Sequence, residues 1–167
     1  PGVKAKKSIR EMALKAIDDT TFYPPAGQNR LLGMIEVKPD WVVSRQRTWG
    51  VPLCVFLNKE TGEFIPSASF EKSGELIDRI VSSFREKGGD AWYEAGSAER
   101  YLKGLVADPA VWEQVRDTVE VWFDSGSTHA FVLEARPDLQ WPASMYLEGS
   151  DQHRGWFHSS LIESCGT

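Results

Sequence analysis

The stretch from Met145 to Phe157 reads M-Y-L-E-G-S-D-Q-H-R-G-W-F, and the rest of the chain is best understood outward from it. Its first three residues suit a buried strand, Glu148–Asp151 suits a turn, and Trp156 begins a run with helical apolar spacing. A strand that passes through a glycine turn into a helix brings backbone N–H groups to the helix N-terminus. This pattern predicts an α/β unit that can hold a nucleotide or an activated acid.

The predicted turn is rich in side chains that bind hydroxyls and amines. Glu148, Asp151, Gln152 and His153 all fall within it or directly after it. An ordinary capped turn, with Asp151 as the N-cap of the helix, explains the same residues. The residues alone leave both interpretations open.

Composition indicates a folded chain with an uneven charge distribution. The 167 residues are 41% hydrophobic and 26% charged, enough to bury the core of one medium domain or two small ones. The net charge is −5, yet residues 1–50 hold nine basic and five acidic residues, whereas residues 51–167 hold ten and nineteen. Any contact with nucleic acid is therefore expected in the first fifty residues.

Cysteine and histidine usage gives no metal or disulfide signature. Cys54 and Cys165 are isolated, and the three histidines lack the spacing of metal ligands. We find no signal peptide and no apolar run that could span a membrane. These features predict a reduced, cytoplasmic protein with no membrane partner. Since the sequence lacks an initiator Met, we expect a piece of a longer polypeptide.

Periodicity predicts a mixture of helices and short strands. A capping box at Ser8–Glu11 predicts a helix there, and further helices are predicted at Gln28–Val37, Glu71–Lys87, Ser97–Leu105 and from Asp108–Pro109 through Val115. Strands are predicted at Thr21–Tyr23, Val51–Leu57, Glu63–Ile65, Asp90–Tyr93 and Val119–Phe123, and the loop Asn58–Gly62 is predicted to join the second and third of them as a hairpin. Residues 53–118 therefore suggest a compact α+β module without catalytic features.

Two further stretches carry polar groups with two possible uses each. The stretch Trp41–Pro52 reads W-V-V-S-R-Q-R-T-W-G-V-P, and Arg45, Gln46 and Arg47 could hold phosphate or the end of an RNA strand. They could equally form a structural pair at a domain junction. The stretch Val121–His129 reads V-W-F-D-S-G-S-T-H and suits either a ligand-facing strand end or a plain turn.

A serine hydrolase is a weak hypothesis. Ser150, Asp151 and His153 are too close in sequence to adopt the geometry of nucleophile, base and orienting acid, and the chain has no G-x-S-x-G elbow.

In their order along the chain, Trp41–Pro52, Val121–His129 and Tyr146–Phe157 resemble the isoleucyl-tRNA synthetase family of class I aminoacyl-tRNA synthetases. The resemblance covers almost the whole chain and implies an α/β fold with a partial Rossmann-type catalytic core. It implies that residues 1–20 close the editing insertion, that 21–52 return into the core, that 53–118 form a connective α+β module and that 119–167 begin the second half of the core.

The resemblance also implies roles for individual residues. Glu148, Gly149, Asp151 and Gln152 match positions that bind the aminoacyl-adenylate, whereas Trp122 and Trp156 match walls of the isoleucine pocket. Arg45, Gln46 and Arg47 remain possible tRNA or junction contacts. A flat apolar wall distinguishes one methylene by only about 1–3 kcal/mol, which is why this family also edits its products. The resemblance implies no catalytic side chain and no metal ligand here.

The implied parent activates isoleucine with ATP and Mg²⁺ to isoleucyl-adenylate and transfers it to tRNA(Ile). It would be a cytoplasmic monomer, and the resemblance leaves room for zinc elsewhere in it. The 167 residues lack the His-Ile-Gly-His and Lys-Met-Ser-Lys-Ser signatures that contact ATP and pyrophosphate. We therefore expect these residues alone to be inactive. The alternative is a non-catalytic RNA-binding module derived from a synthetase, with salt-dependent binding through residues 1–50.

Overall fold

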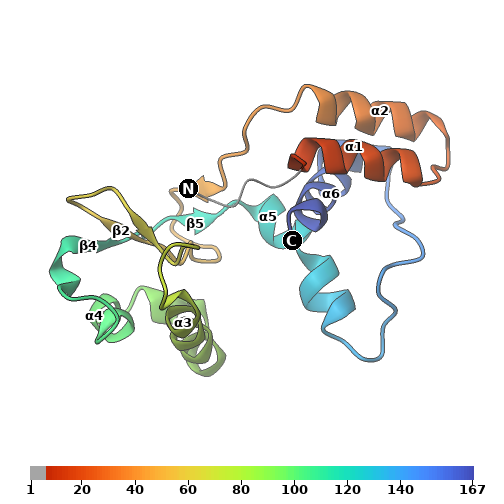
Figure 1. Cartoon of the computed structure of the whole chain (residues 1–167). Coiled ribbons are helices and arrows are strands. Elements are labelled where there is room, and N and C mark those ends of the chain that lie inside the picture. Colours follow the sequence, from red (N-terminus) through yellow and green to blue (C-terminus); the bar gives the residue numbers. More distant parts are fainter. Residues whose placement is uncertain (1–6) are drawn as a thin grey trace. The chain divides into compact units, whose positions relative to one another are not determined.

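The computed structural model describes residues 7–167, and Figure 1 labels their longer helices and several of their strands. They divide into two compact units, one formed by Ser44–Val119 and the other by residues 7–43 together with residues 120–167. Every strand that the structure describes belongs to the first unit, and both units contain helices. The predicted mixed α/β class is confirmed.

The unit Ser44–Val119 contains two small antiparallel sheets. One sheet has the order β3-β2-β4, and the other pairs β1 with β5. The strands are β1 (Ser44–Arg45), β2 (Phe56–Asn58), β3 (Phe64–Ile65), β4 (Trp112–Gln114) and β5 (Thr118–Val119). The predicted hairpin after β2 is confirmed, because Asn58 Oδ1 accepts the N–H groups of Glu60 and Thr61 and Gly62 adopts a φ of 74°.

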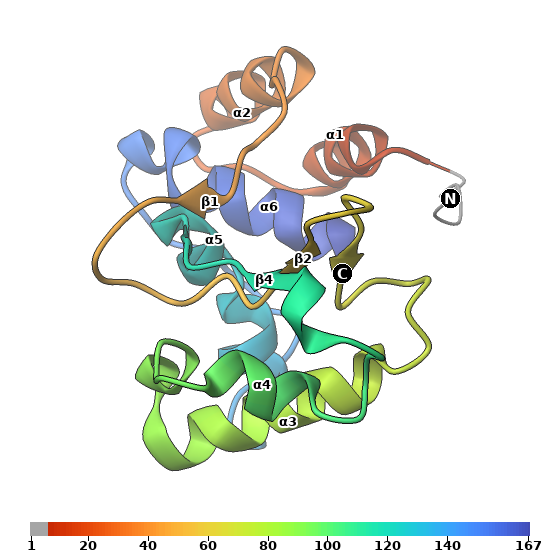
Figure 2. The same cartoon turned by 90° about the vertical axis from the view of Figure 1, so that its left-hand side faces the viewer.

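The helices of this unit cover an aromatic core. They are α3 (Ser73–Lys87), η1 (Gly89–Trp92), α4 (Ser97–Leu102) and η2 (Pro109–Val111), and α3 and α4 lie side by side in Figure 2. The ring centroid of Trp92 lies 5.0 Å from that of Phe56 and 5.5 Å from that of Tyr101. Trp92 Nε1 donates to Val115 O at 2.8 Å, so this fully buried indole has its polar atom satisfied.

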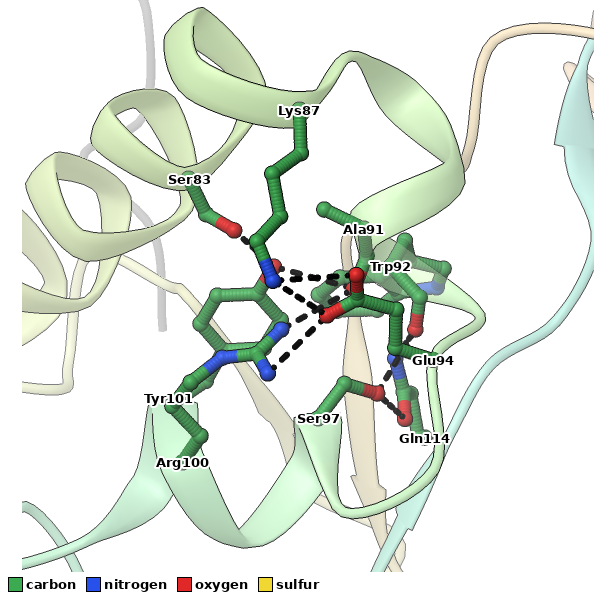
Figure 3. A network of polar contacts seen from close by, with 9 residues as sticks. All are labelled: Ser83, Lys87, Ala91, Trp92, Glu94, Ser97, Arg100, Tyr101 and Gln114. Carbon is green, nitrogen blue, oxygen red and sulfur yellow. Dashed lines mark hydrogen bonds and ion pairs between the residues drawn. The ribbon is translucent and has the colours of Figure 1, made fainter.

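A polar network joins α3, η1 and α4 (Figure 3). The carboxylate of Glu94 accepts from Lys87 Nζ at 3.0 and 3.1 Å and forms an ion pair with Arg100 Nη1 at 3.1 Å. Tyr101 donates its phenol O–H to Ser83 Oγ at 3.0 Å. The network fixes the end of α3 against α4.

The second unit is helical in its described residues. It consists of α1 (Ile9–Asp19), α2 (Ala26–Glu36), α5 (Val121–Gly126), the π-helix η3 (His129–Glu134), the 3₁₀ helix η4 (Ser150–Arg154) and α6 (Trp156–Gly166). Helix α1 lies beside both α2 and α6 (Figure 1). The predicted capping box begins α1, since Ser8 Oγ accepts from Glu11 N and Glu11 Oε2 accepts from Ser8 N.

Side chains at helical spacing form the core of this unit. Ala13 and Ile17 of α1 are buried against Leu31 and Ile35 of α2. Leu161, Ile162 and Cys165 of α6 pack against this cluster. The buried faces of α1, α2 and α6 therefore meet in one core.

Several predicted strands are wrong. Val119–Phe123 is a strand only at Val119, and the chain turns into α5 at Val121. The Glu120 N–H donates to Val43 O, and ladder pairing ends there. Met145–Leu147 has no regular structure, and Met145 and Leu147 are 75% and 81% exposed. No described strand pairs with this segment, and an apolar run without a partner does not form a sheet.

Other differences concern short elements. Thr21–Tyr23 is not a strand, and Asp90–Tyr93 is largely the 3₁₀ helix η1. The helix predicted from Asp108 ends at Val111, where the chain enters β4. Asp108 does cap η2 by accepting from Ala110 N. In each case pairing or packing in space decides the outcome, because local propensity is weak over three to five residues.

Candidate functional site

The Glu148–Gln152 turn is held by Gln152. Its Nε2 donates to Asp151 Oδ2 at 3.0 Å, and its Oε1 accepts from the backbone N–H of Trp156 at 2.9 Å. Gln152 therefore satisfies an N–H group at the start of α6, and Asp151, which lies inside η4, does not cap that helix. The amide side chain links the turn to the helix.

Two carboxylates of the turn face solvent. Glu148 and Asp151 are exposed, and no hydrogen bond or ion pair to the Glu148 carboxylate is found within residues 7–167. A Cβ built on Gly149 would lie 2.6 Å from Asp151 Oδ1, so the Asp151 carboxylate occupies space that a side chain at residue 149 would need. Both carboxylates are thus accessible to a ligand.

The structure brings Trp122 against the backbone that precedes Trp156. A Cβ on Gly155 would lie 2.9 Å from Cη2 of Trp122, so the glycine permits this close approach. Trp156 Nε1 donates to Ser125 O of α5 at 3.0 Å and lies 3.3 Å from Thr128 Oγ1. Its ring stacks on Tyr146 with centroids 4.5 Å apart. The two predicted pocket tryptophans therefore belong to one locally fixed arrangement.

A small hollow of about 80 Å³ lies beside Trp122. It is lined by Lys38, Trp41, Glu120, Trp122, Arg154, Gly155, His158, Ser159 and Ile162. Ligand pockets usually measure about 300–1,000 Å³. This hollow by itself is too small for an aminoacyl-adenylate.

Two buried titratable groups on α6 were not predicted. Burial, with a contribution from Lys38, lowers the pKa of His158 to about 4. Burial, with repulsion from Asp124, raises the pKa of Glu163 to about 7. His158 Nε2 and Glu163 Oε1 are buried without a hydrogen-bond partner in the described part of the chain. The only sequence signal for these two residues is that they lie on a mostly apolar predicted helix. That signal does not tell whether a polar side chain on the helix is buried or exposed.

Residues 44–52 of the Trp41–Pro52 stretch have a structural role in the unit Ser44–Val119. Ser44 and Arg45 pair with Val119 and Thr118, and Thr118 Oγ1 donates to Arg45 O at 3.2 Å. Gly50 has a φ of 149°, and a Cβ there would lie 3.0 Å from that of Thr118. Arg45 Nη1 donates to Ser44 O at 2.9 Å, whereas Gln46 and Arg47 are exposed. Whether these three side chains contact tRNA remains a prediction.

A larger hollow of about 320 Å³ lies between α3 and α4, lined by Arg79, Ser83, Glu86, Lys87, Arg100 and Tyr101. Its cations already have anionic partners. Lys87 and Arg100 bind Glu94 (Figure 3), and Arg79 Nη2 lies 2.6 Å from Glu75 Oε1. This arrangement braces the helices.

The weak hypothesis of a serine hydrolase finds no supporting geometry in the described residues. His153 is buried, its Nδ1 lies 2.7 Å from Ser150 O, and Asp151 accepts from Gln152, so these side chains do not form a hydrolase triad. Residues 7–167 contain no group of three His, Cys, Asp or Glu side chains that could hold a metal ion. In that same range, no helix is long and apolar enough to cross a membrane.

Comparison with known proteins decides the family. Residues 3–167 match the family model described as tRNA synthetases class I (I, L, M and V). The chain belongs to this class I tRNA synthetase family. Within it, the chain is 59% identical over 160 residues to the isoleucine–tRNA ligase of Mesorhizobium japonicum, covering 96% of this chain and 15% of that protein.

Further relatives give the same result for this class I synthetase chain. It is 58% identical over 160 residues to the isoleucine–tRNA ligase of Brucella abortus, covering 96% of this chain and 16% of the relative. It is 56% identical over 159 residues to that of Pelagibacter ubique, covering 95% and 17%. The chain thus spans about one sixth of the length of these relatives, and the resemblance recognised in its motifs is confirmed.

Proposed function

We propose that this chain is part of an isoleucine–tRNA ligase and forms one wall of its aminoacyl-adenylate site. The observation that carries the proposal is the fixed arrangement of Trp122, Gly155 and Trp156 beside an exposed acidic turn. Aromatic rings supply an apolar surface for a branched aliphatic side chain. Exposed carboxylates supply acceptors for an ammonium group and ribose hydroxyls.

The proposed reaction has two steps. The carboxylate of isoleucine attacks the α-phosphorus of ATP, pyrophosphate leaves, and isoleucyl-adenylate forms. A terminal ribose hydroxyl of tRNA(Ile) then attacks the acyl carbon, loses its proton, and AMP leaves. Neither step needs a protein nucleophile, so positioning and charge stabilisation account for the acceleration.

The residues of this chain have binding roles in that scheme. Glu148 and Asp151 accept hydrogen bonds from the adenylate, Gly149 allows the turn to approach it, and Gln152 holds the turn on α6. Trp122 and Trp156 contact the isoleucine side chain. Because residues 7–167 offer no cluster that could hold a metal, we assign none of them to Mg²⁺ or zinc, and ATP would carry its Mg²⁺ to residues elsewhere.

Residues elsewhere in the parent would complete the site, so the 167 residues alone should not catalyse the reaction. In this proposal residues 1–20, 21–52, 53–118 and 119–167 correspond to the end of the editing insertion, the return segment, the connective module and the second half of a Rossmann-type core. The parent would be a cytoplasmic monomer. Arg45, Gln46 and Arg47 would contact tRNA or brace the junction.

The test is amino-acid-dependent ATP–pyrophosphate exchange by the full-length parent. Isoleucine should support faster exchange than leucine, valine or methionine at equal concentration, and tRNA(Ile) should be charged. Exchange that prefers another amino acid would reassign the pocket. No exchange, together with salt-dependent RNA binding, would favour the non-catalytic RNA-binding module.

A further inference from the structure

Helix α2 approaches the Glu148–Gln152 turn through Gly27 and His153. A Cβ built on Gly27 would lie 2.9 Å from Nε2 of His153 and 3.4 Å from Cδ1 of Phe22. Cβ atoms essentially never come within 3.0 Å of a non-bonded heavy atom of a distant residue, so the absence of a side chain at Gly27 is what allows this contact. More than 120 residues of chain separate the two positions.

The His153 side chain is buried and has fixed neighbours. It is 7% exposed, and its ring lies edge-on to Phe157 at 5.5 Å and 83°. Its Nδ1 lies 2.7 Å from Ser150 O. A carbonyl oxygen only accepts hydrogen bonds, so Nδ1 carries the proton and donates it. The imidazole of His153, which faces α2, is therefore hydrogen-bonded to Ser150, the first residue of η4.

We infer that His153 is a positioning residue that α2 holds, through Gly27, so that η4 presents Asp151 and Gln152 to the adenylate. This inference rests on the proposed function. The two binding residues lie between Ser150 and His153, the two ends of the Nδ1–H···O hydrogen bond. Displacing the ring would shift both ends of a single 3₁₀ turn, and Gln152 would lose its alignment with the Trp156 N–H.

Two glycines of α2 give a matched pair for the test. Gly27 contacts His153, whereas Gly33 lies on the same helix with nothing within 4 Å of a Cβ. Alanine is favoured over glycine by helix propensity at both positions. In the full-length parent, Gly27→Ala should lower kcat/KM for isoleucine-dependent exchange by about tenfold or more, and Gly33→Ala should leave it within about twofold. Equal values for the two variants would overturn the inference.

Substitutions of His153 separate positioning from packing. His153→Asn keeps an N–H donor near the place of Nδ1 but loses the ring, whereas His153→Leu keeps apolar bulk and loses the donor. If His153 positions the turn, the His153→Asn variant should have a kcat/KM at least about fivefold higher than that of the His153→Leu variant. Amide hydrogen exchange across residues 150–156 should then quicken in the Leu variant only.

The outcomes distinguish the inference from the proposed function. If the Leu variant equals or exceeds the Asn variant in both activity and amide protection, His153 only fills space and the inference is overturned. If the wild-type parent shows no isoleucine-dependent exchange, the proposed function is wrong. In that case amide protection still decides whether His153 fixes the turn, and the inference about adenylate positioning is overturned.

Discussion

The ring of Trp122 lies against the backbone of Gly155, at a distance that leaves no room for a Cβ atom. Gly155 also precedes Trp156, whose backbone N–H is bound by Gln152 Oε1 and whose indole N–H is bound by Ser125 O. One glycine therefore sets the approach of α5 to the start of α6. This relationship links a motif near residue 122 to a motif near residue 155.

We predict that Gly155→Ala disturbs both tryptophans. A Cβ would lie 2.9 Å from Trp122 and 2.5 Å from Gln152 Oε1, so the ring and the helix-capping amide must move. In the full-length parent, kcat/KM for isoleucine in pyrophosphate exchange should fall roughly tenfold to hundredfold. Gly33→Ala, where a Cβ meets open space, is the control. A Gly155→Ala parent with the activity of this control would show that the contact is irrelevant to the site.

Trp122→Ala should weaken isoleucine binding more than ATP binding. The ring is 40% exposed and forms part of the hollow beside Gly155, so its removal takes away apolar surface without removing an acceptor for the nucleotide. We expect KM for isoleucine to rise at least roughly tenfold. Trp141→Ala, which removes an indole that is 52% exposed in a loop, should change neither KM. Equal rises in both KM values after Trp122→Ala would mean that Trp122 is only part of the fold.

Glu163 should make the chain less stable as pH rises. Its pKa is raised to about 7 in the folded chain against an ordinary 4.5, so the folded state binds more protons than the unfolded state between these values. Stability is therefore fully present below about pH 4.5 and is lost as pH rises through about 7. Glu163→Gln should remove this loss, as measured by denaturant unfolding of the 167-residue chain. If the free energy of unfolding varies with pH in the same way for the wild type and for Glu163→Gln, the raised pKa of Glu163 is contradicted.

His158 should act in the opposite direction. Its pKa is lowered to about 4 from 6.5, so the unfolded state binds the proton first. Stability is present above about pH 6.5 and is lost as pH falls through about 4. Because this trend opposes that of Glu163 between about pH 4.5 and 6.5, it is best measured in a Glu163→Gln background. Adding His158→Gln there should flatten the acid side of the profile, and an unchanged acid side would contradict the assignment.

Local signals in the sequence predicted the elements that local interactions stabilise. The capping box of Ser8 and Glu11 and the Asn58–Gly62 hairpin loop both depend on residues a few positions apart. The structure confirms each of them. The strand at Met145–Leu147 failed because a strand depends on a partner, and no described strand lies beside it.

The sequence motifs named the residues of the candidate site but not the contacts among them. The motifs named Trp122, Trp156 and the Glu148–Gln152 turn. They did not reveal that Gly155 contacts Trp122, that Gly27 contacts His153, or that Gly126 lets α5 approach the Ser159 backbone of α6. At these positions glycine is needed because residues distant in sequence pack where a Cβ would lie. The spacing of residues along the chain carries no information about such contacts.

Glu148 gives the most direct test of the central claim, that this chain carries the adenylate-binding turn of an isoleucine–tRNA ligase. The measurement is isoleucine-dependent ATP–pyrophosphate exchange by the full-length parent carrying Glu148→Ala, beside Glu134→Ala, which removes another exposed carboxylate. We predict a loss of roughly a hundredfold or more for Glu148→Ala with an unchanged unfolding profile, and no loss for the control. Exchange by Glu148→Ala at the wild-type rate would contradict the account.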